Sequence, residues 1–194
     1  MIDRYAASDK YTYPDSQVLR NKAGLRDAEV LDRFERTRVA IRALEPGPPR
    51  TFDYKHFRAI HRHLFQDVYD WAGEERTVDI SKGRTRFAGS RFIRQNAEGL
   101  FAELHRERLL VGNSREGFAK RAAYYLNELN ILHPFREGNG RVAREFLRLL
   151  SENAGYDLDP SHLTKEAWLG VCVDGVLQGE EPMAALIFRA LQPL

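Results

Sequence analysis

Cysteine is almost absent from this chain of 194 residues, since Cys172 is the only one. No intramolecular disulfide can therefore form, which fits a reducing compartment such as the cytosol. No apolar stretch approaches the roughly 20 residues of a transmembrane helix, and Met1 to Lys10 is polar and charged, without the apolar core of a signal peptide. We expect a cytoplasmic protein with no membrane partner.

The chain also lacks a large excess of charge of either sign. It has 30 Lys and Arg against 28 Asp and Glu, which leaves a net charge of +2. Domains that bind nucleic acid usually show a strong basic excess on one face, so we expect no direct nucleic-acid partner. There are no repeats and no low-complexity linkers. With 43% hydrophobic and 30% charged residues, the composition predicts one globular domain over residues 1–194.

The hydrophobic pattern is mainly helical, so we predict an all-α fold. The expected helices span Asp27 to Leu44, Asp53 to Leu64, Phe92 to Leu104, Asn113 to Asn130, Arg141 to Ala154, Thr164 to Val173 and Pro182 to Ala190. Asn113 with Glu116 resembles a capping box. His56, His61 and His63 have no acidic or cysteine partner at a matching spacing, which favours packing or solvated roles over a metal site.

One region is typical of a β-hairpin. Its expected strands are Thr77 to Ile80 and Thr85 to Phe87, joined through Lys82-Gly83-Arg84 with Gly83 at the tip. Arginines around the tip make it locally basic, and a solvated surface explains them about as well as a binding role does.

The most informative segment combines several groups suited to moving a charged phosphoryl group. It reads His133-Pro134-Phe135-Arg136-Glu137-Gly138-Asn139-Gly140-Arg141-Val142-Ala143-Arg144. His133 can act as a base near neutral pH, and Glu137 offers the hard oxygen ligand that Mg²⁺ prefers. Gly138-Asn139-Gly140 allows a turn whose N–H groups face an anion at a helix N-terminus. Arg141 and Arg144 lie three residues apart and share a helical face. Each feature alone is commonly structural, but their uninterrupted order indicates a site.

This segment resembles the signature of Fic-domain proteins, and every specified position of that signature is met. The stretch from Ile60 through Trp71-Ala72-Gly73 to Arg76 and Asp79-Ile80 is also similar to these proteins. The resemblance covers roughly residues 13–188. It implies a Fic-type helical domain whose core spans about residues 50–155, with helical additions at both ends and a β-hairpin, the flap, beside the active-site loop.

The resemblance also implies an activity, the transfer of AMP from ATP to a Tyr, Thr or Ser hydroxyl of a target protein. His133 would be the catalytic base and Glu137 the Mg²⁺ ligand. The nucleotide would be bound by Gly138, Asn139, Gly140, Arg141 and Arg144, and by Ser81, Lys82 and Gly83 of the flap. Phe135 is expected to pin the loop from inside, and Arg136, at the variable position, is left unassigned.

Further expectations follow from the resemblance. Phosphate-transferring relatives such as the Doc toxin have Lys where this chain has Gly140, which favours AMP transfer here. The target is expected to dock along the flap hairpin. Many relatives carry an inhibitory Ser/Thr-x-x-x-Glu-Gly/Asn pattern whose glutamate pairs with the second arginine of the motif. No glutamate here has Ser or Thr four residues before it, so a small antitoxin would supply the glutamate in trans to Arg144. The chain thus resembles toxins of bacterial Fic toxin–antitoxin pairs that act on the type II topoisomerases, DNA gyrase and topoisomerase IV.

Three alternatives remain open. The chain could be a non-catalytic module that binds nucleotide, although a scaffold need keep neither His133 nor Glu137. It could transfer UMP, GMP or phosphocholine instead of AMP. It could also be the Fic domain of a secreted effector that modifies a host protein.

Overall fold

The fold is built mainly from helices that pack around α2, α4 and α5. The computed structural model describes residues 9–82 and 85–194, without the side chains of residues 176–178. The α-helices are α1 (Ala28–Ala43), α2 (Tyr54–Phe65), α3 (Ile93–Arg106), α4 (Arg115–Leu132), α5 (Asn139–Asn153), α6 (Lys165–Gln178) and α7 (Glu181–Ala190). Short 3-10 helices are η1 (Ser90–Phe92), η2 (Arg108–Leu110) and η3 (Pro160–His162), and the strands are β1 (Ser81–Lys82), β2 (Thr85–Arg86), β3 (Tyr156–Leu158) and β4 (Leu191–Pro193). The predicted helical fold with a small hairpin is confirmed.

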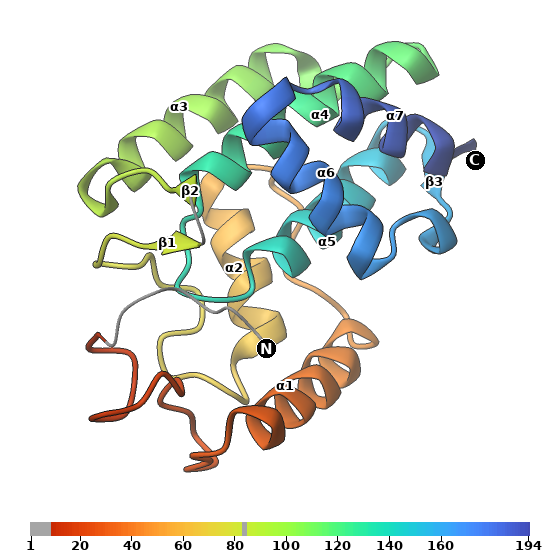
Figure 1. The fold of residues 1–194 in the computed structure, drawn as a ribbon. Coiled ribbons are helices and arrows are strands. Elements are labelled where there is room, and N and C mark those ends of the chain that lie inside the picture. The colour runs from red at the N-terminus through yellow and green to blue at the C-terminus, as the bar shows by residue number, and fades with distance from the viewer. Residues whose placement is uncertain (1–8, 83–84) are drawn as a thin grey trace.

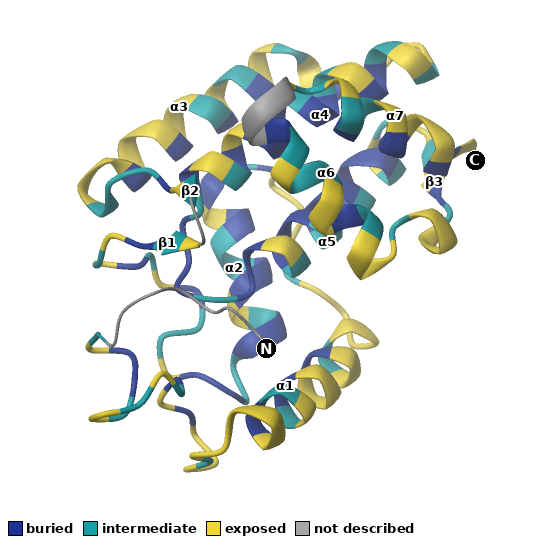
Figure 2. Cartoon of the chain, in the orientation of Figure 1, coloured by how far each residue is buried: buried dark blue, intermediate teal, exposed yellow. Residues whose placement is uncertain are grey.

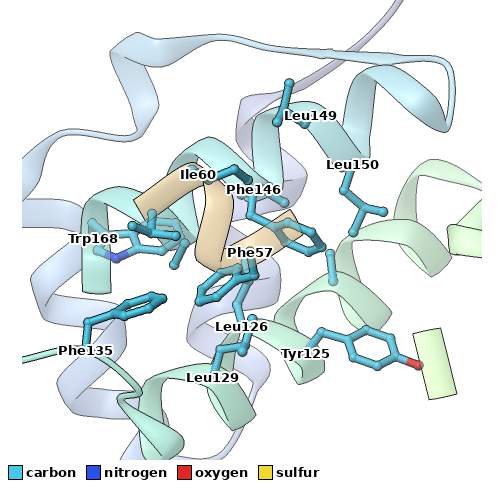
Figure 3. Packing of buried hydrophobic residues seen from close by; sticks show 14 of the residues in the cluster. Phe57, Ile60, Tyr125, Leu126, Leu129, Phe135, Phe146, Leu149, Leu150 and Trp168 are labelled. Atoms are coloured by element: carbon cyan, nitrogen blue, oxygen red, sulfur yellow. The ribbon is translucent and has the colours of Figure 1, made fainter. Parts of the chain in front are cut away.

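The core lies between the central helices. Figure 1 shows α2 between α1 on one side and α3 and α4 on the other, and the burial colours in Figure 2 mark the outer side of α1 as exposed. Figure 3 shows Phe57, Phe135 and Phe146 in one cluster, where the ring centroid of Phe57 lies 5.7 Å from that of Phe135 and 5.6 Å from that of Phe146. Burying each such ring stabilises the fold by about 1.5–3 kcal/mol. The core therefore includes Phe135 of the loop that joins α4 to α5.

Helix starts follow the capping residues, with one correction. Asp27 caps α1 by accepting the N–H groups of Glu29 and Val30, each at 2.9 Å, and Asp53 caps α2 as expected. The predicted cap of α4 at Asn113 is wrong, because the Ser114 hydroxyl accepts the Gly117 N–H at 3.1 Å. With this cap, Glu116 still lies in the first turn of α4, where its negative charge interacts favourably with the positive end of the helix dipole.

Glycine residues set two helix boundaries that differ from the prediction. α5 begins at Asn139 and not at Arg141, because Gly138 adopts a left-handed conformation (φ 85°) directly before it and can serve as its N-cap. α6 continues past Val173 to Gln178 and ends at Gly179, whose φ of 90° favours glycine. The first of these changes matters for the site, since it moves the helix N-terminus into the glycine-rich segment.

The hairpin is shorter than predicted. Its strands are Ser81–Lys82 and Thr85–Arg86, paired antiparallel with Ser81 opposite Arg86 and Lys82 opposite Thr85. None of residues 77–80, the predicted first strand, is part of β1. The Val78 carbonyl accepts from a buried side chain, and the Asp79 carboxylate accepts the Ser90 N–H at 2.7 Å. The predicted tip, Gly83, lies outside the described residues.

A second pair of strands was not predicted from the sequence. Tyr156–Leu158 pairs antiparallel with Leu191–Pro193 and joins the segment after α5 to the end of the chain. Three-residue strands are too short to show an alternating pattern. Among the described helices, none has the length and apolar character needed to cross a membrane.

Candidate functional site

His133 ends α4 and opens the loop to α5. Its N–H donates to the Leu129 carbonyl at 2.9 Å, and its φ is 46°, in the left-handed region. Pro134 follows and has no N–H with which to continue the helix. The left-handed conformation costs a non-glycine residue about 1–2 kcal/mol, so contacts around the loop must hold His133 in place.

The ring of His133 is held in one tautomer. Nδ1 lies 3.1 Å from the Asn130 carbonyl oxygen. A carbonyl can only accept, so Nδ1 carries the proton and Nε2 is the nitrogen that can accept one. Burial lowers the pKa of His133 to about 4; the Asn130 bond and Glu137 oppose this shift, whereas Arg76 and Lys82 add to it. His133 is therefore neutral at pH 7, as a general base must be.

Asn139 closes the loop between the two helices. Its side-chain oxygen accepts the Phe135 N–H at 2.9 Å, and its amide nitrogen donates to the Phe135 carbonyl at 2.8 Å. The Phe135 ring is fully buried and stacks on His61, with centroids 4.0 Å apart. The expected structural role of Phe135 is confirmed. The Asn139 side chain shapes the loop, so its backbone N–H is the group it offers to a ligand.

The first turn of α5 has donors available for an anion. The N–H groups of Arg141 and Val142 donate to the Gly138 carbonyl at 3.0 and 3.1 Å. Within residues 9–82 and 85–194, no hydrogen bond from the N–H of Asn139 or Gly140 is observed. Such N–H groups at a helix start bind phosphate, carboxylate or sulfate oxygens.

Gly138 cannot be replaced without distorting this turn. A Cβ atom at Gly138 would lie 2.4 Å from the buried Phe65 ring, at a φ of 85°. We expect Gly138→Ala to destabilise the fold by about 2–5 kcal/mol through backbone strain and overpacking, measured by urea unfolding. Gly99→Ala is the matched control, because Gly99 lies inside α3 with open space around its Cβ position, and alanine there should stabilise the helix slightly. Equal stability of the two variants would contradict this account.

Glu137 is held from both its main chain and its side chain. Oε1 accepts the Gly138 N–H at 3.0 Å and lies 3.6 Å from Nη2 of Arg141. Its carbonyl oxygen accepts from Nε2 of His61 at 3.0 Å, and Nδ1 of His61 accepts the Gly73 N–H at 2.8 Å. Burial lowers the pKa of His61 to about 3, so this ring is a neutral support. Glu137 is thereby held beside the first turn of α5.

The other histidines on α2 have structural roles. His56 is buried, and its Nδ1 accepts the Phe52 N–H at 3.2 Å. Nε2 of His63 donates to the Arg42 carbonyl at 2.7 Å. The predicted packing roles are confirmed. Over the described residues, no group of three or more His, Cys, Asp or Glu side chains is arranged to hold a metal ion.

The two motif arginines have different surroundings. Arg141 donates to Oε1 of Glu35 at 2.6 Å, and Glu35, on α1, is 1% exposed. Tyr69 donates to the other oxygen of Glu35, and the guanidinium of Arg141 lies over the Phe65 ring at 4.6 Å. Although burial lowers the pKa of Arg141, Glu35 and Glu137 raise it overall. The charge of Arg141 is thus largely balanced within the protein.

Arg144 has no carboxylate partner in the part of the chain that the structure describes. Its guanidinium lies 5.9 Å from the Trp168 ring, and its pKa is lowered by burial and by the nearby charge of Arg141. Arg141, Arg144, Glu145 and Arg148 line a groove of about 290 Å³. Arg148 is paired with Glu145 and Glu152. Arg144 is therefore the motif arginine whose charge is best placed for a ligand.

The flap stands next to His133. The Phe87 ring, directly after β2, stacks on the His133 ring with centroids 3.9 Å apart, and Phe87 packs with Ile80 in a small separate cluster. Ser81 and Lys82 of β1 belong to this hairpin, and Lys82 is near enough to lower the pKa of His133. The structure thus brings Ser81, Lys82 and the motif to one region.

Several supporting residues were not predicted. Arg136 is buried and donates to Asp9 at 2.9 Å, which ties the N-terminal segment to the loop. Glu35 and His61 support Arg141 and Glu137 from other helices. Such residues lie far apart in sequence and show no common spacing. His61 and Arg76 lie within the stretch from Ile60 to Ile80 that the resemblance had marked, and Arg136 lies within the motif itself, but their contacts were not predicted.

Comparison with known proteins adds independent findings. A family model described as the Fic/DOC family matches residues 51–151, which include the motif and the flap. The chain is 42% identical over 192 residues to the probable protein adenylyltransferase y4lH of Sinorhizobium fredii, covering 98% of this chain and 100% of the relative. It is 39% identical over 188 residues to the protein adenylyltransferase VbhT of Bartonella schoenbuchensis, covering 95% of this chain and 39% of VbhT.

The solved structures agree with the fold. The BepC protein of Bartonella tribocorum, a VirB-translocated effector crystallised with AMPPNP, superposes with a TM-score of 0.86 at 28% identity. The match covers 95% of this chain and 97% of that chain. The agreement extends over nearly the whole of both chains.

Proposed function

Because this chain belongs to the Fic/DOC family, we propose that it is a protein adenylyltransferase, which moves AMP from ATP to a hydroxyl of a target protein. One observation carries the proposal. The loop from His133 to Gly138 joins a neutral imidazole, with its proton fixed on Nδ1, to a helix start that has N–H groups available. A base and an anion site at the two ends of one short loop suit phosphoryl transfer.

In the proposed reaction, AMP moves from ATP to a hydroxyl group of the target protein. The oxygen of a target Tyr, Thr or Ser attacks the α-phosphorus of ATP, and His133 Nε2 takes its proton. The bond between the α-phosphorus and the bridging oxygen breaks, so AMP stays on the target and pyrophosphate leaves. The imidazolium then returns its proton to solvent. The N–H groups of Asn139 and Gly140 and the guanidinium of Arg144 neutralise phosphate charge.

Gly140 favours AMP as the transferred group. A Cβ atom at Gly140 would lie 3.4 Å from the Trp168 indole nitrogen, an ordinary van der Waals distance, so the preference for AMP is inferred from the resemblance. Relatives that transfer phosphate, such as Doc, have Lys at the matching position. We therefore place the α- and β-phosphates of ATP over the Gly138–Gly140 segment.

Mg²⁺ fits Glu137. Mg²⁺ in nucleotide sites is usually held by one or two carboxylates together with substrate phosphates, so one carboxylate beside the phosphate site suffices. Arg141 and the Gly138 N–H hold this carboxylate in place. When bound, Mg²⁺ would neutralise charge on the phosphate oxygens.

The target would bind along the flap. Among the described residues, Ser81–Lys82 and Thr85–Arg86 form a sheet of two strands only, so an extended target segment can add a strand at an outer edge. The stacked Phe87 and His133 rings then bring that segment close to the base.

The decisive experiment is mass spectrometry of a bacterial lysate incubated with the purified chain and labelled ATP. The proposal expects AMP on a Tyr, Thr or Ser of a discrete protein. UMP, GMP or phosphocholine on the target from the matching donors would revise the transferred group. Failure to label any protein from any donor would favour a non-catalytic nucleotide-binding module.

The target class belongs to the same proposal. We take the chain to be the toxin of a toxin–antitoxin pair that modifies DNA gyrase and topoisomerase IV without itself contacting DNA. Incubation with purified gyrase and topoisomerase IV tests this directly. Labelling of host-cell proteins and not of topoisomerases would favour a secreted effector. A Fic domain can be part of a longer protein, since the match with VbhT covers only 39% of VbhT.

The proposed inhibition by an antitoxin can be tested at Arg144. A small antitoxin would insert a glutamate against Arg144, which has no carboxylate of its own among the described residues. The chain alone should therefore be active as purified and toxic in bacteria. Arg144→Ala should weaken ATP binding about tenfold to a hundredfold, the value of one charge-assisted contact, and should lose sensitivity to the antitoxin.

The matched control is Arg148→Ala, one turn further along α5, since Arg148 is paired with Glu145 and Glu152. It should keep ATP affinity and sensitivity to the antitoxin. The assay is calorimetric ATP binding with and without the protein encoded beside this gene. An inert but folded lone chain would mean that the inhibitory element lies within these residues or that no enzyme is present.

A further inference from the structure

Arg76 is among the largest fully buried side chains of the described residues, and 0% of its side chain is exposed. A buried cation usually requires a close anionic partner. The Asp79 carboxylate lies 4.0 Å away, is 56% exposed and also accepts the Ser90 N–H. The charge of Arg76 must therefore be satisfied largely by other groups.

Those groups are main-chain carbonyl oxygens from two parts of the molecule. Nε donates to His133 at 2.7 Å and Nη2 to Leu132 at 3.2 Å. Nη1 donates to Val78 at 2.7 Å, and Nη2 also donates to Ala88. Leu132 and His133 end α4, where the carbonyls carry the negative end of the helix dipole. One guanidinium thus replaces the hydrogen bonds that this helix end lacks.

The other two carbonyls define the stem of the flap. Val78 precedes β1 and Ala88 follows β2, so both chains of the hairpin are bound to Arg76. The main chain adds to this link, since the Arg76 N–H donates to the Pro134 carbonyl at 2.8 Å and the Ala88 N–H donates to Ile131 at 3.1 Å. The flap stem and the His133 loop are consequently joined at one point.

We infer that Arg76 is a positioning residue that fixes the flap relative to His133, so that a hydroxyl presented along the flap meets Nε2. This inference rests on the proposed AMP transfer. The four guanidinium hydrogen bonds of Arg76 described above all reach main-chain carbonyls, and none of these belongs to the proposed phosphate site. Its effect passes through two backbone segments that must keep one geometry while the target is bound.

Arg76→Lys tests the geometry while keeping the charge. A lysine places its three donors on a single nitrogen at the end of a flexible stem, so it cannot bridge the flap stem and the end of α4 as the guanidinium fork does. Misplacement on the order of 1 Å can cost about a hundredfold in rate. We expect AMP transfer at saturating ATP to slow by about that factor, while ATP affinity stays unchanged because the phosphate site is on α5.

The experiment compares variants for transfer of label from ATP marked on its α-phosphate to proteins of a bacterial lysate, and for calorimetric ATP binding. Arg121→Lys is the matched control, since Arg121 lies on α4 and pairs with Glu103 and Glu107, away from the flap. It should keep the parental rate. A slow Arg76→Lys variant with parental ATP affinity supports the inference. A parental rate, or a loss of ATP affinity that accounts for the slow rate, overturns it.

Phe87→Leu decides the question if Arg76→Lys does not fold. It removes the ring contact by which the flap that Arg76 holds meets the His133 ring. If AMP transfer requires the flap stem and His133 to keep one fixed geometry, this variant should also slow transfer while ATP affinity stays unchanged. A parental rate would overturn the inference. Failure of the proposed function is a separate result, in which the parental protein transfers no label at all.

Discussion

Replacing His133 by alanine should lower the rate of AMP transfer by about two to four orders of magnitude, the usual cost of removing a general base. ATP affinity should change little, because the imidazole acts on the incoming hydroxyl and the phosphates are bound by the N–H groups of α5 and by Arg144. The proton held on Nδ1 by the Asn130 carbonyl is the physical reason to assign the proton transfer to Nε2, and the lowered pKa keeps the ring neutral at pH 7. Single-turnover labelling with calorimetric ATP binding measures both quantities.

His162→Ala is the control for this variant. His162 is exposed at the end of η3, so its loss should leave both rate and affinity at parental values. If His133→Ala labelled its target at the parental rate, the base would have to be another group and the mechanism above would be wrong.

The motif proposed to be catalytic could be predicted because it is contiguous. His133, Glu137 and the Gly138–Gly140 segment lie within eight positions of one another, so a loop between two helices brings them together whatever the rest of the fold does. The helical fold was predictable for a similar reason, since apolar periodicity over ten or more residues reports a buried helix face.

The supporting residues could not be predicted, because they depend on how distant helices pack. The carboxylate of Glu35 on α1 pairs with Arg141, whereas Arg144 has no carboxylate partner among the described residues. The two motif arginines therefore differ, although their spacing in the sequence suggested equivalent roles. Arg76 lies in a segment with no regular structure, and nothing in its sequence context indicates that its side chain binds four carbonyls. Buried pairing of this kind is set by tertiary contacts.

The positions of the strands were not predicted correctly, for two reasons. Residues 77–80 have the composition of a strand, yet their polar groups bind Arg76 and Ser90. Three-residue strands such as Tyr156–Leu158 carry too little pattern to be recognised. Side-chain hydrogen bonds with the main chain therefore decided where the hairpin begins.

Glu137→Gln should lower activity by about two to three orders of magnitude, because neutralising charge on phosphate oxygens is worth several kcal/mol. Glutamine keeps the shape of the side chain and its contact with the Gly138 N–H, so the fold and the turn should survive. The loss should be only partly rescued by excess Mg²⁺, since the remaining ligands would come from the nucleotide. Steady-state rates over a Mg²⁺ titration measure the effect.

Glu152→Gln is the matched control, at the far end of the same helix, where Glu152 pairs with Arg148 and Arg50. It should keep the parental Mg²⁺ dependence, although it loses surface ion pairs that contribute little to stability. Because Glu137 also lies 3.6 Å from Arg141, its replacement leaves that arginine with Glu35 as its main partner. A fall in rate that no Mg²⁺ concentration alters would therefore indicate an electrostatic effect through Arg141. Full activity of the parental chain in metal-free buffer would remove Glu137 from the metal site altogether.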